Sequence, residues 1–347
     1  AYADSLIRFV FRSGFIMKPL FNKARAEPKR VIYAEGEDER VLRAVQTVVE
    51  EGLAVPILIG RPSVVESRLE RFGLSIRPGK DFELVNPEDD PRYRDYVQTY
   101  IEVAGRKGIR PDAARTLVRT NSTVIAAIAL KRGDVDAMLC GVEGRFTSRL
   151  RYIKDIIGLA PGTEDFAALS LMVTSKGAYF LADTHVRWNP SAREIADMAI
   201  LADGHVRRFG LEPKIALLSH SDFGSGDSPD ARKMREAVEL IVQRRPDIAV
   251  DGEMQADTAL SEAIREKVLP DARFKGEANV LIMPNLDAAN IAYQFTKIMA
   301  DALPVGPILM GTALPAHILT PSVTARGIVN MTAVAVADAQ ARRAAVR

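Results

Sequence analysis

Arginines and hydroxyl residues that follow short apolar segments are the side chains of this sequence best suited to bind an anion. Residues 306–310 predict a buried strand that ends in a turn at Gly311, because strands buried on both faces are continuous apolar runs bounded by Gly or Pro. Thr324 and Arg326 then open the last apolar run, residues 328–339. Free N–H groups at a helix start, the helix dipole and a guanidinium together favour a phosphate or carboxylate. Arg326 is therefore a candidate anion ligand, or else a solvated residue of a helix cap.

A second candidate anion site follows the predicted strand 134–140. Residues 145–151 contain three arginines and two hydroxyl residues directly after the strand end, among them Ser148 and Arg151. Ligands of α/β proteins bind beyond the carboxyl ends of the strands, which favours a functional interpretation. A basic surface loop explains the same residues equally well.

A loop rich in Gly and Ser, residues 219–226, lies between the predicted strand 215–218 and a helix capped by Ser228. Gly224 and Ser225 could expose backbone N–H groups to a phosphate. The loop is neither a GxGxxG motif nor a Walker A motif, so it is a weak indication by itself.

Two more strand-to-helix corners carry carboxylates and carboxamides. They are residues 252–257 and residues 284–287, and Asn290 and Tyr293 follow one turn into the second of the helices. With the Gly-Ser loop, these corners predict polar side chains at one edge of a second sheet.

An acidic cluster, Glu35-Gly36-Glu37-Asp38-Glu39-Arg40, follows the predicted strand 31–34. Clustered carboxylates could serve metal binding or acid–base chemistry. The first turn of a helix is also where acidic side chains complement the dipole, with Arg40 and Arg43 as partners one turn on. The second, structural interpretation is favoured.

The composition is that of an ordinary globular protein. The 347 residues predict two domains, and 47 basic against 45 acidic residues give a net charge of +2, which argues against a nucleic-acid or anionic-membrane surface. The single cysteine, Cys140, fits a packed strand end in a cytoplasmic protein. The four histidines have no metal-ligand spacing, so no metal site is expected.

Local patterns add three further expectations. Residues 1–24 are amphipathic with interspersed charges, which is typical neither of a signal peptide nor of a membrane span. Residues 123–130 are apolar all round and predict a fully buried helix. Residues 169–173 and 179–182 predict a hairpin, in an otherwise alternating order of strands and helices.

Several segments together resemble the phosphotransacetylase and phosphotransbutyrylase family, in its fused form at the C-terminus of bacterial NADP-dependent malic enzymes. They are AEGEDER, LSHSDFGSG, VDGEMQAD, ANVLIMPNLDAANIAYQ and GPILMG, and they span nearly the whole chain. The segments HILTPSVTARGIVNMTAV and RFVFRSGFIMKPLF indicate the fused form, the latter resembling the linker after the malic enzyme catalytic part. A cloning remnant or a dimer-contact arm is the competing interpretation of that first segment.

The resemblance implies an α/β fold of two α/β/α domains, similar to isocitrate and isopropylmalate dehydrogenases, with a cleft between the domains. Residues 25–161 and 306–347 would form domain 1, residues 162–305 domain 2, and residues 1–24 a linker helix. The family moves an acetyl group between phosphate and coenzyme A. It uses the serine of a Ser-Arg-Gly motif, an aspartate seven residues later as base, and arginines that hold the phosphate.

This sequence departs from the family at those catalytic positions. The serine is replaced by Ala325, counting seven residues onward without a gap reaches Thr332, and an arginine position falls on Ala104. Arg326 and Arg151 are kept. The expected function is therefore a regulatory domain of a malic enzyme that binds acetyl-CoA as an allosteric effector without acetyltransferase activity. The expected effector-binding residues are Ser148, Arg151, Gly224, Ser225, Asn290, Tyr293, Gly311, Thr324 and Arg326.

Two alternatives remain open: an active phosphate acetyltransferase with relocated catalytic groups, and an oligomerisation module without a ligand. The resemblance also implies a homo-oligomer, at least a dimer, with a malic enzyme catalytic domain in the same chain. NADP and a divalent metal are expected only in that catalytic domain, and no cofactor is expected in this one.

Overall fold

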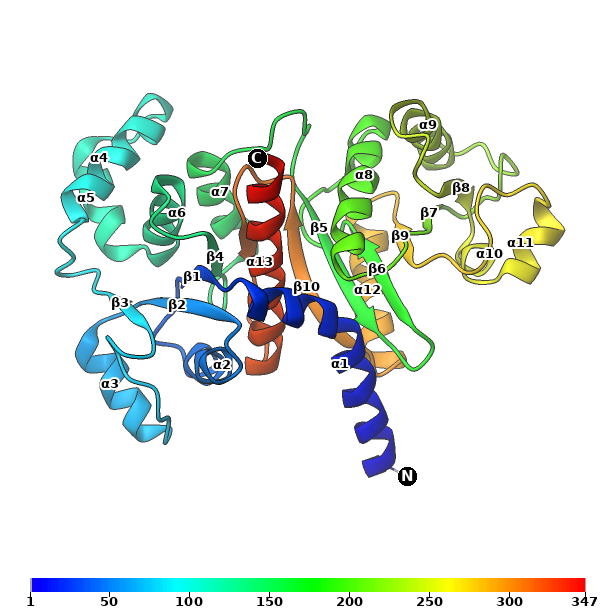
Figure 1. Cartoon of the computed structure of the whole chain (residues 1–347). Helices are drawn as coiled ribbons and strands as arrows, with labels where there is room; N and C mark the ends of the chain where they lie inside the picture. The colour runs from blue at the N-terminus through cyan, green and yellow to red at the C-terminus, as the bar shows by residue number, and fades with distance from the viewer. Residues whose placement is uncertain (1, 347) are drawn as a thin grey trace. The chain divides into compact units, whose positions relative to one another are not determined.

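The computed structural model describes the backbone of residues 2–346 and the side chains of residues 14–342. The chain packs as two units (Figure 1). Unit 1 contains residues 1–19 and 162–311, and unit 2 contains residues 20–161 and 312–347. Both are α/β units, as the sequence predicts.

Unit 2 is built on a parallel sheet with the strand order β11-β4-β1-β2-β3. The strands are β1 (Lys29–Tyr33), β2 (Ala54–Ile59), β3 (Glu83–Val85), β4 (Ala137–Cys140) and β11 (Ala316–Ile318). Strand β1 is buried at almost every position, as expected for a parallel strand covered on both faces.

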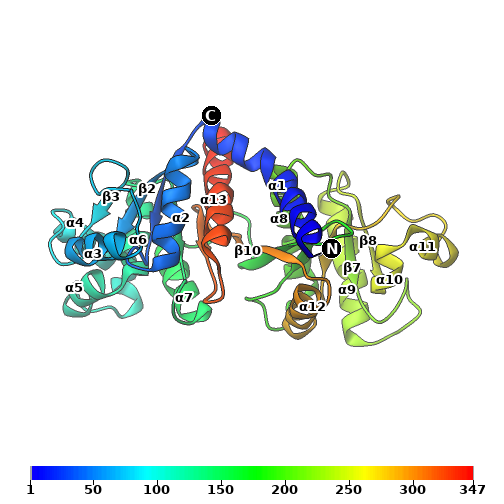
Figure 2. The same cartoon turned by 90° about the horizontal axis from the view of Figure 1, so that it is seen from below.

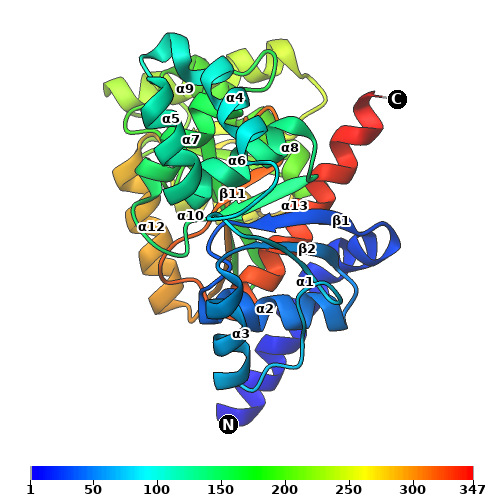
Figure 3. The same ribbon diagram turned by 90° about the vertical axis from the view of Figure 1, so that its left-hand side faces the viewer.

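Helices cover both faces of this sheet. On one face α2 and α13 lie side by side (Figure 2), and the helices α4 to α7 lie on the opposite face (Figure 3). Residues 123–130 of α6 are all buried, as their apolar pattern predicts. The helices are α2 (Glu39–Glu50), α3 (Pro62–Arg71), α4 (Tyr93–Ala104), the 3-10 turn η1 (Gly105–Lys107), α5 (Pro111–Thr120), α6 (Ser122–Arg132), α7 (Phe146–Ile156) and α13 (Ala325–Val346).

Unit 1 is built on a mixed sheet with the strand order β10-β5-β6-β9-β7-β8. Strands β6, β9, β7 and β8 are parallel, whereas β5 is antiparallel to both of its neighbours. The strands are β5 (Ala167–Val173), β6 (Ala178–Ala182), β7 (Ile215–Leu218), β8 (Val250–Met254), β9 (Val280–Ile282) and β10 (Leu303–Met310). The predicted hairpin is confirmed as β5 and β6, and its turn is closed by the Thr174 hydroxyl, which accepts the Gly177 N–H.

Helices α8 and α9 pack together against the unit 1 sheet, and α12 packs on β5 and β6. The capping box of Ser191 and Glu194 fixes the start of α8. The helices are α8 (Ala192–Arg208), α9 (Pro229–Arg244), α10 (Ala256–Leu260), α11 (Glu262–Val268) and α12 (Leu286–Met299).

Strand β10 lies in unit 1, so the expected return to the first domain at Gly306 is wrong. It pairs with β5 along its length, and the chain enters unit 2 only after Gly311. The register shifts between Val305 and Ile308, and Gly306 sits there at φ 137° with the Leu169 carbonyl 3.1 Å from the position of an added Cβ. A glycine is therefore required at this bulge.

Helix α1 (Tyr2–Ala26) begins in unit 1 and ends in unit 2. Met17, Leu20, Phe21 and Ala24 are buried at helical spacing, whereas Phe15 is 74% exposed. The side chains of Leu6, Ile7, Val10 and Phe11, on which the amphipathic pattern also rests, lie outside the described residues. None of the described helices is long and apolar enough to cross a membrane.

Candidate functional site

The carboxyl ends of the parallel strands of unit 2 meet at one edge, and the chain order reverses between β1 and its neighbour β4. Such a switch point is where open α/β sheets bind ligands. A cavity of about 300 Å³ opens here, lined among others by Glu35, Arg68, Arg119, Ser122 and Glu143. The edge therefore offers a polar binding space within unit 2.

Most of the acidic cluster is structural, as the favoured interpretation predicts. Asp38 caps α2 by accepting the Arg40 N–H, and Glu39 pairs with Arg43 one turn on. The Arg40 guanidinium pairs with Asp38 and also donates to the carbonyls of three residues from two other loops. These are Val142, Pro321 and Val323. Arg40 thus ties the loops after β1, β4 and β11 together.

Glu35 differs from the other acids of the cluster. Its carboxylate is 9% exposed, lines the cavity and accepts the Gly141 N–H with both oxygens, at 3.0 and 3.1 Å. Burial raises the pKa of Glu35 to about 7, an effect that the Gly141 N–H and Arg149 only partly offset. A carboxyl group that titrates near neutrality in a cavity is a feature of functional sites, which the sequence interpretation missed.

Ser148 and Arg151 lie on α7, which follows β4, and both side chains are exposed. The Arg151 guanidinium lies 5.3 Å from the Tyr152 ring. Both side chains are accessible to a ligand at unit 2, and their role as effector ligands stays a prediction.

Thr324 and Arg326 begin α13 as expected, but each is engaged within unit 2. The Thr324 hydroxyl accepts the Gly327 N–H at 3.1 Å, so Thr324 is a helix cap. The half-exposed Arg326 guanidinium lies 5.4 Å from the Phe21 ring and 3.8 Å from Glu51. An exposed pair at that distance is weak, so Arg326 remains free to exchange partners.

Two of the three positions carried over from the family's catalytic residues lie in the core. Thr332 is completely buried, and its hydroxyl lies 2.8 Å from the Tyr33 hydroxyl and 2.9 Å from the Ile328 carbonyl. Ala104 is also buried. Counting seven residues onward from Ala325 thus reaches a core position.

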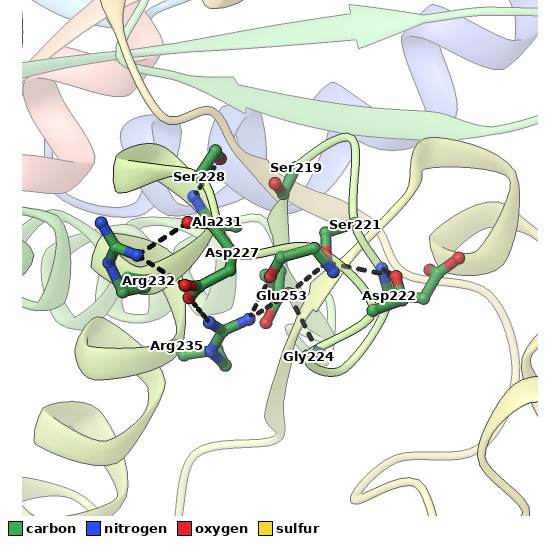
Figure 4. A network of polar contacts seen from close by, with 12 residues as sticks. Ser219, Ser221, Asp222, Gly224, Asp227, Ser228, Ala231, Arg232, Arg235 and Glu253 are labelled. Atoms are coloured by element: carbon green, nitrogen blue, oxygen red, sulfur yellow. Dashed lines mark hydrogen bonds and ion pairs between the residues drawn. The ribbon is translucent and has the colours of Figure 1, made fainter.

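In unit 1 the Gly-Ser loop is organised around Glu253, at the end of β8 (Figure 4). The Glu253 side chain is fully buried. Its Oε1 accepts bonds from the Ser221 hydroxyl at 2.6 Å, the Gly224 N–H at 3.1 Å and the Arg235 guanidinium at 2.8 Å. Its Oε2 has no hydrogen-bond partner among the described residues. Sequence reasoning did not identify Glu253 as the residue that holds the loop together.

The backbone donors of the Gly-Ser loop are used inside the protein. The N–H groups of residues 222–226 donate to Ser225 Oγ, the Glu253 carbonyl, Glu253 Oε1, the Asp222 carbonyl and Ser221 Oγ, in that order. These N–H groups therefore do not form the phosphate cradle that Gly224 and Ser225 suggested. A ligand would meet the exposed surface of the loop instead.

Asn290 and Tyr293 lie beside the turn that follows β6. Asn290 Nδ2 donates to the Thr184 carbonyl at 3.1 Å, and the Tyr293 ring stacks edge-on with His185 at 5.9 Å. Burial lowers the pKa of His185 to about 4, so its imidazole is neutral at pH 7. Asn290 and Tyr293 thus stabilise the turn, and the sequence did not single out His185.

The Asp183 carboxylate shapes the same turn. It accepts the N–H groups of Ala168, His185, Val186 and Arg187.

Gly311 is also structural, because it has φ 84° and an added Cβ would lie 2.9 Å from the Asp165 carbonyl. Cys140 is completely buried, which raises the pKa of its thiol, so it is a packed strand-end residue as predicted.

The model of the phosphate acetyl/butaryl transferase family matches residues 15–336. An NAD-dependent malic enzyme of Rhizobium meliloti is 59% identical over 97% of this chain, and an NADP-dependent malic enzyme of Escherichia coli is 46% identical over 98%. The chain covers 44% and 45% of these relatives, so it spans about half of their length.

Solved structures agree with the sequence match. A phosphotransacetylase from Streptococcus pyogenes superimposes with a TM-score of 0.88 at 28% identity, over 94% of this chain and 98% of that one. The match covers most of both units, including the carboxyl ends of the strands in each sheet. The chain therefore belongs to the phosphate acetyl/butaryl transferase family, in the form that malic enzymes carry.

Proposed function

We propose that this chain is a regulatory domain of a malic enzyme, that it binds acetyl-CoA, and that it does not catalyse acetyl transfer. The observation that carries the proposal is the combination of family membership with Ala325 and a core-facing Thr332 at the carried-over catalytic positions. Neither side chain can hydrogen-bond a reacting acyl group or accept a thiol proton. A chain that has the family's fold but lacks the catalytic hydroxyl and carboxylate is better suited to bind acetyl-CoA than to catalyse acetyl transfer.

The parent enzyme would oxidatively decarboxylate malate to pyruvate in the cytoplasm. The sequence alone suggested NADP, but the relatives include both an NAD- and an NADP-dependent enzyme. The nucleotide and the divalent metal would belong to the catalytic part. For acetyl-CoA to regulate that part, it must bind two states of the protein with unequal affinity.

The proposed ligand contacts are tested by substitution of Arg151. We expect Arg151→Ala to weaken acetyl-CoA binding about 10- to 100-fold, the effect of losing charge-assisted bonds to a phosphate. Isothermal titration calorimetry measures it, with Arg77→Ala as the control because Arg77 is an exposed arginine outside the site. Equal affinities for wild type and Arg151→Ala would remove Arg151 from the site.

The chain is also proposed to form a homodimer through α12. The side chains of Ile291, Phe295, Ile298 and Met299 are 56% to 79% exposed at helical spacing. An apolar stripe of this kind marks an interaction surface, and a second copy of the same stripe would cover it with two-fold symmetry.

Sedimentation equilibrium tests this interface. We expect Phe295→Glu to give monomers at micromolar concentration, because a carboxylate buried without a partner opposes association. Lys297→Gln, on the side of the same helix away from the stripe, should leave the dimer intact. A dimer that survives Phe295→Glu would exclude α12 as the interface.

A further inference from the structure

The side chain of Arg40 uses every hydrogen-bond donor that a guanidinium has. Its Nε and Nη2 donate to the two carboxylate oxygens of Asp38, at 3.0 and 2.9 Å. Nη2 also donates to the Val142 carbonyl at 3.1 Å, and Nη1 donates to the carbonyls of Pro321 at 2.6 Å and Val323 at 3.3 Å. Because a guanidinium has five N–H donors, Arg40 has none left for a ligand. We call Arg40, Asp38 and the three carbonyls the Arg40 clamp.

The three carbonyls belong to two segments that carry proposed effector-binding residues. The Val142 carbonyl lies shortly before α7, which contains Ser148 and Arg151. The other two carbonyls lie shortly before α13, whose first turn contains Arg326. All of these elements belong to unit 2. One side chain of α2 therefore ties together the two segments from which the proposed anion ligands extend.

Residues 320–323, before α13, have few other restraints. The pairing of β11 with β4 ends before this segment, at Ile318 and Cys140. Residues 320–323 are exposed or half-buried, and the hydrogen bonds among them stay within one turn. Elsewhere in the described part of the chain, only the Arg40 guanidinium is hydrogen-bonded to them. Loss of these bonds would therefore release the segment that leads to Arg326.

Asp38 holds the guanidinium of the clamp in place. Its carboxylate caps α2 by accepting the Arg40 N–H at 2.8 Å and also binds the Arg40 guanidinium with both oxygens. The Asp38 side chain is 12% exposed and the Arg40 side chain 32% exposed. A bidentate ion pair that is partly buried has a better defined geometry than an exposed pair. The clamp is therefore anchored to the first turn of α2.

We propose that Arg40 is a positioning residue of the effector site: it fixes the segments before α7 and α13, so that Arg151 and Arg326 are in place for one ligand. The inference rests on the proposed function. A ligand that meets two ordered segments does not have to order them on binding, which increases its affinity. Since Arg40 has no free donor, its effect on affinity passes through these segments.

Hydrogen–deuterium exchange tests the clamp without a ligand. We expect Arg40→Lys to exchange about five- to tenfold faster than the wild type at residues 141–145 and 322–327, as for the loss of a charge-assisted hydrogen bond. Lysine keeps the charge but has three donors on one nitrogen, so it cannot bind Asp38 and all three carbonyls. Unchanged exchange in both segments would overturn the proposal.

Two further variants show whether the effect belongs to the clamp. Asp38→Asn keeps a good helix cap but loses the charge that orients Arg40, so we expect a smaller acceleration in the same two segments. Arg43→Lys, one turn along α2 and paired with Glu39, should exchange like the wild type. The buried α6 reports whether unit 2 is folded. If α6 exchanges faster in Arg40→Lys, Asp38→Asn decides the proposal.

Acetyl-CoA titrations test whether the clamp acts on the ligand site. We expect Arg40→Lys to bind about tenfold more weakly than the wild type, although the net charge is unchanged. In a double-mutant cycle, Arg151→Ala should lose less affinity in the Arg40→Lys background, because a displaced Arg151 already contributes less. Wild-type affinity of Arg40→Lys, or two losses that simply multiply, would overturn the positioning role.

The positioning role and the proposed function fail in different ways. Absence of acetyl-CoA binding to the wild type would defeat the proposed function, and the exchange data would still decide whether Arg40 holds the two segments. Equal binding by the wild type and Arg40→Lys would defeat the positioning role alone.

Discussion

Acetyl transfer from acetyl phosphate to CoA by this chain is expected to be at least about 10³-fold slower than by a phosphate acetyltransferase. A lost oxyanion donor reduces the rate by about 10² to 10³. A lost general base reduces it by about 10² to 10⁴. The two losses need not add in full. A combined loss of about 10³ is larger than either loss at its minimum and smaller than the product of the two minima.

A coupled assay of acetyl-CoA formation measures this rate, with a phosphate acetyltransferase as the positive control. Ala325→Ser serves as the matched variant, because it restores the hydroxyl without creating a base at position 332. We expect Ala325→Ser to remain slow. Turnover of the wild type within about tenfold of the control would establish an active acetyltransferase with relocated groups.

Glu253→Ala is expected to have the largest effect on stability in unit 1, about 2 to 4 kcal/mol. The substitution removes two hydrogen bonds to the Gly-Ser loop and a third to Arg235 of α9, which loses its buried partner. Glu253→Gln keeps the shape and loses the charge, so we expect a smaller loss of about 1 to 2 kcal/mol.

Urea unfolding of the three proteins gives these free energies. Glu236→Ala, an exposed acid on α9 next to Arg235, is the control and should change stability by less than about 0.5 kcal/mol. If Glu253→Ala and Glu236→Ala proved equally stable, the loop would not depend on the Glu253 network. Loop exchange rates that rise only in Glu253→Ala would locate the loss at residues 219–226.

The sequence predicted the parts of the fold that depend on local pattern. The buried α6, the β5–β6 hairpin and the capping role of Asp38 follow from apolar periodicity, turn residues and helix-start chemistry. The sequence did not predict that β10 belongs to unit 1. Its place is decided by pairing with β5, which is far away in the sequence. Long-range pairing leaves no local signal in a short apolar run.

The candidate site was harder to predict, because side-chain direction and burial decide it. Glu35 and Asp38 belong to one acidic cluster, yet only Glu35 is buried beside Gly141, whereas Asp38 caps a helix. The Gly-Ser loop has the composition of a phosphate loop, but the distant Glu253 and its own serines occupy its donors. Counting residues from Ala325 could not reveal that Thr332 faces Tyr33.

Calorimetric titration of acetyl-CoA into the wild-type chain tests the central claim most directly. We predict saturable binding with a submillimolar Kd and one ligand per chain, in the same sample whose acetyl transfer is at least about 10³-fold below that of a phosphate acetyltransferase. Absence of heat up to about 1 mM acetyl-CoA, in a sample that still forms dimers, would contradict the claim and leave an assembly module without a ligand.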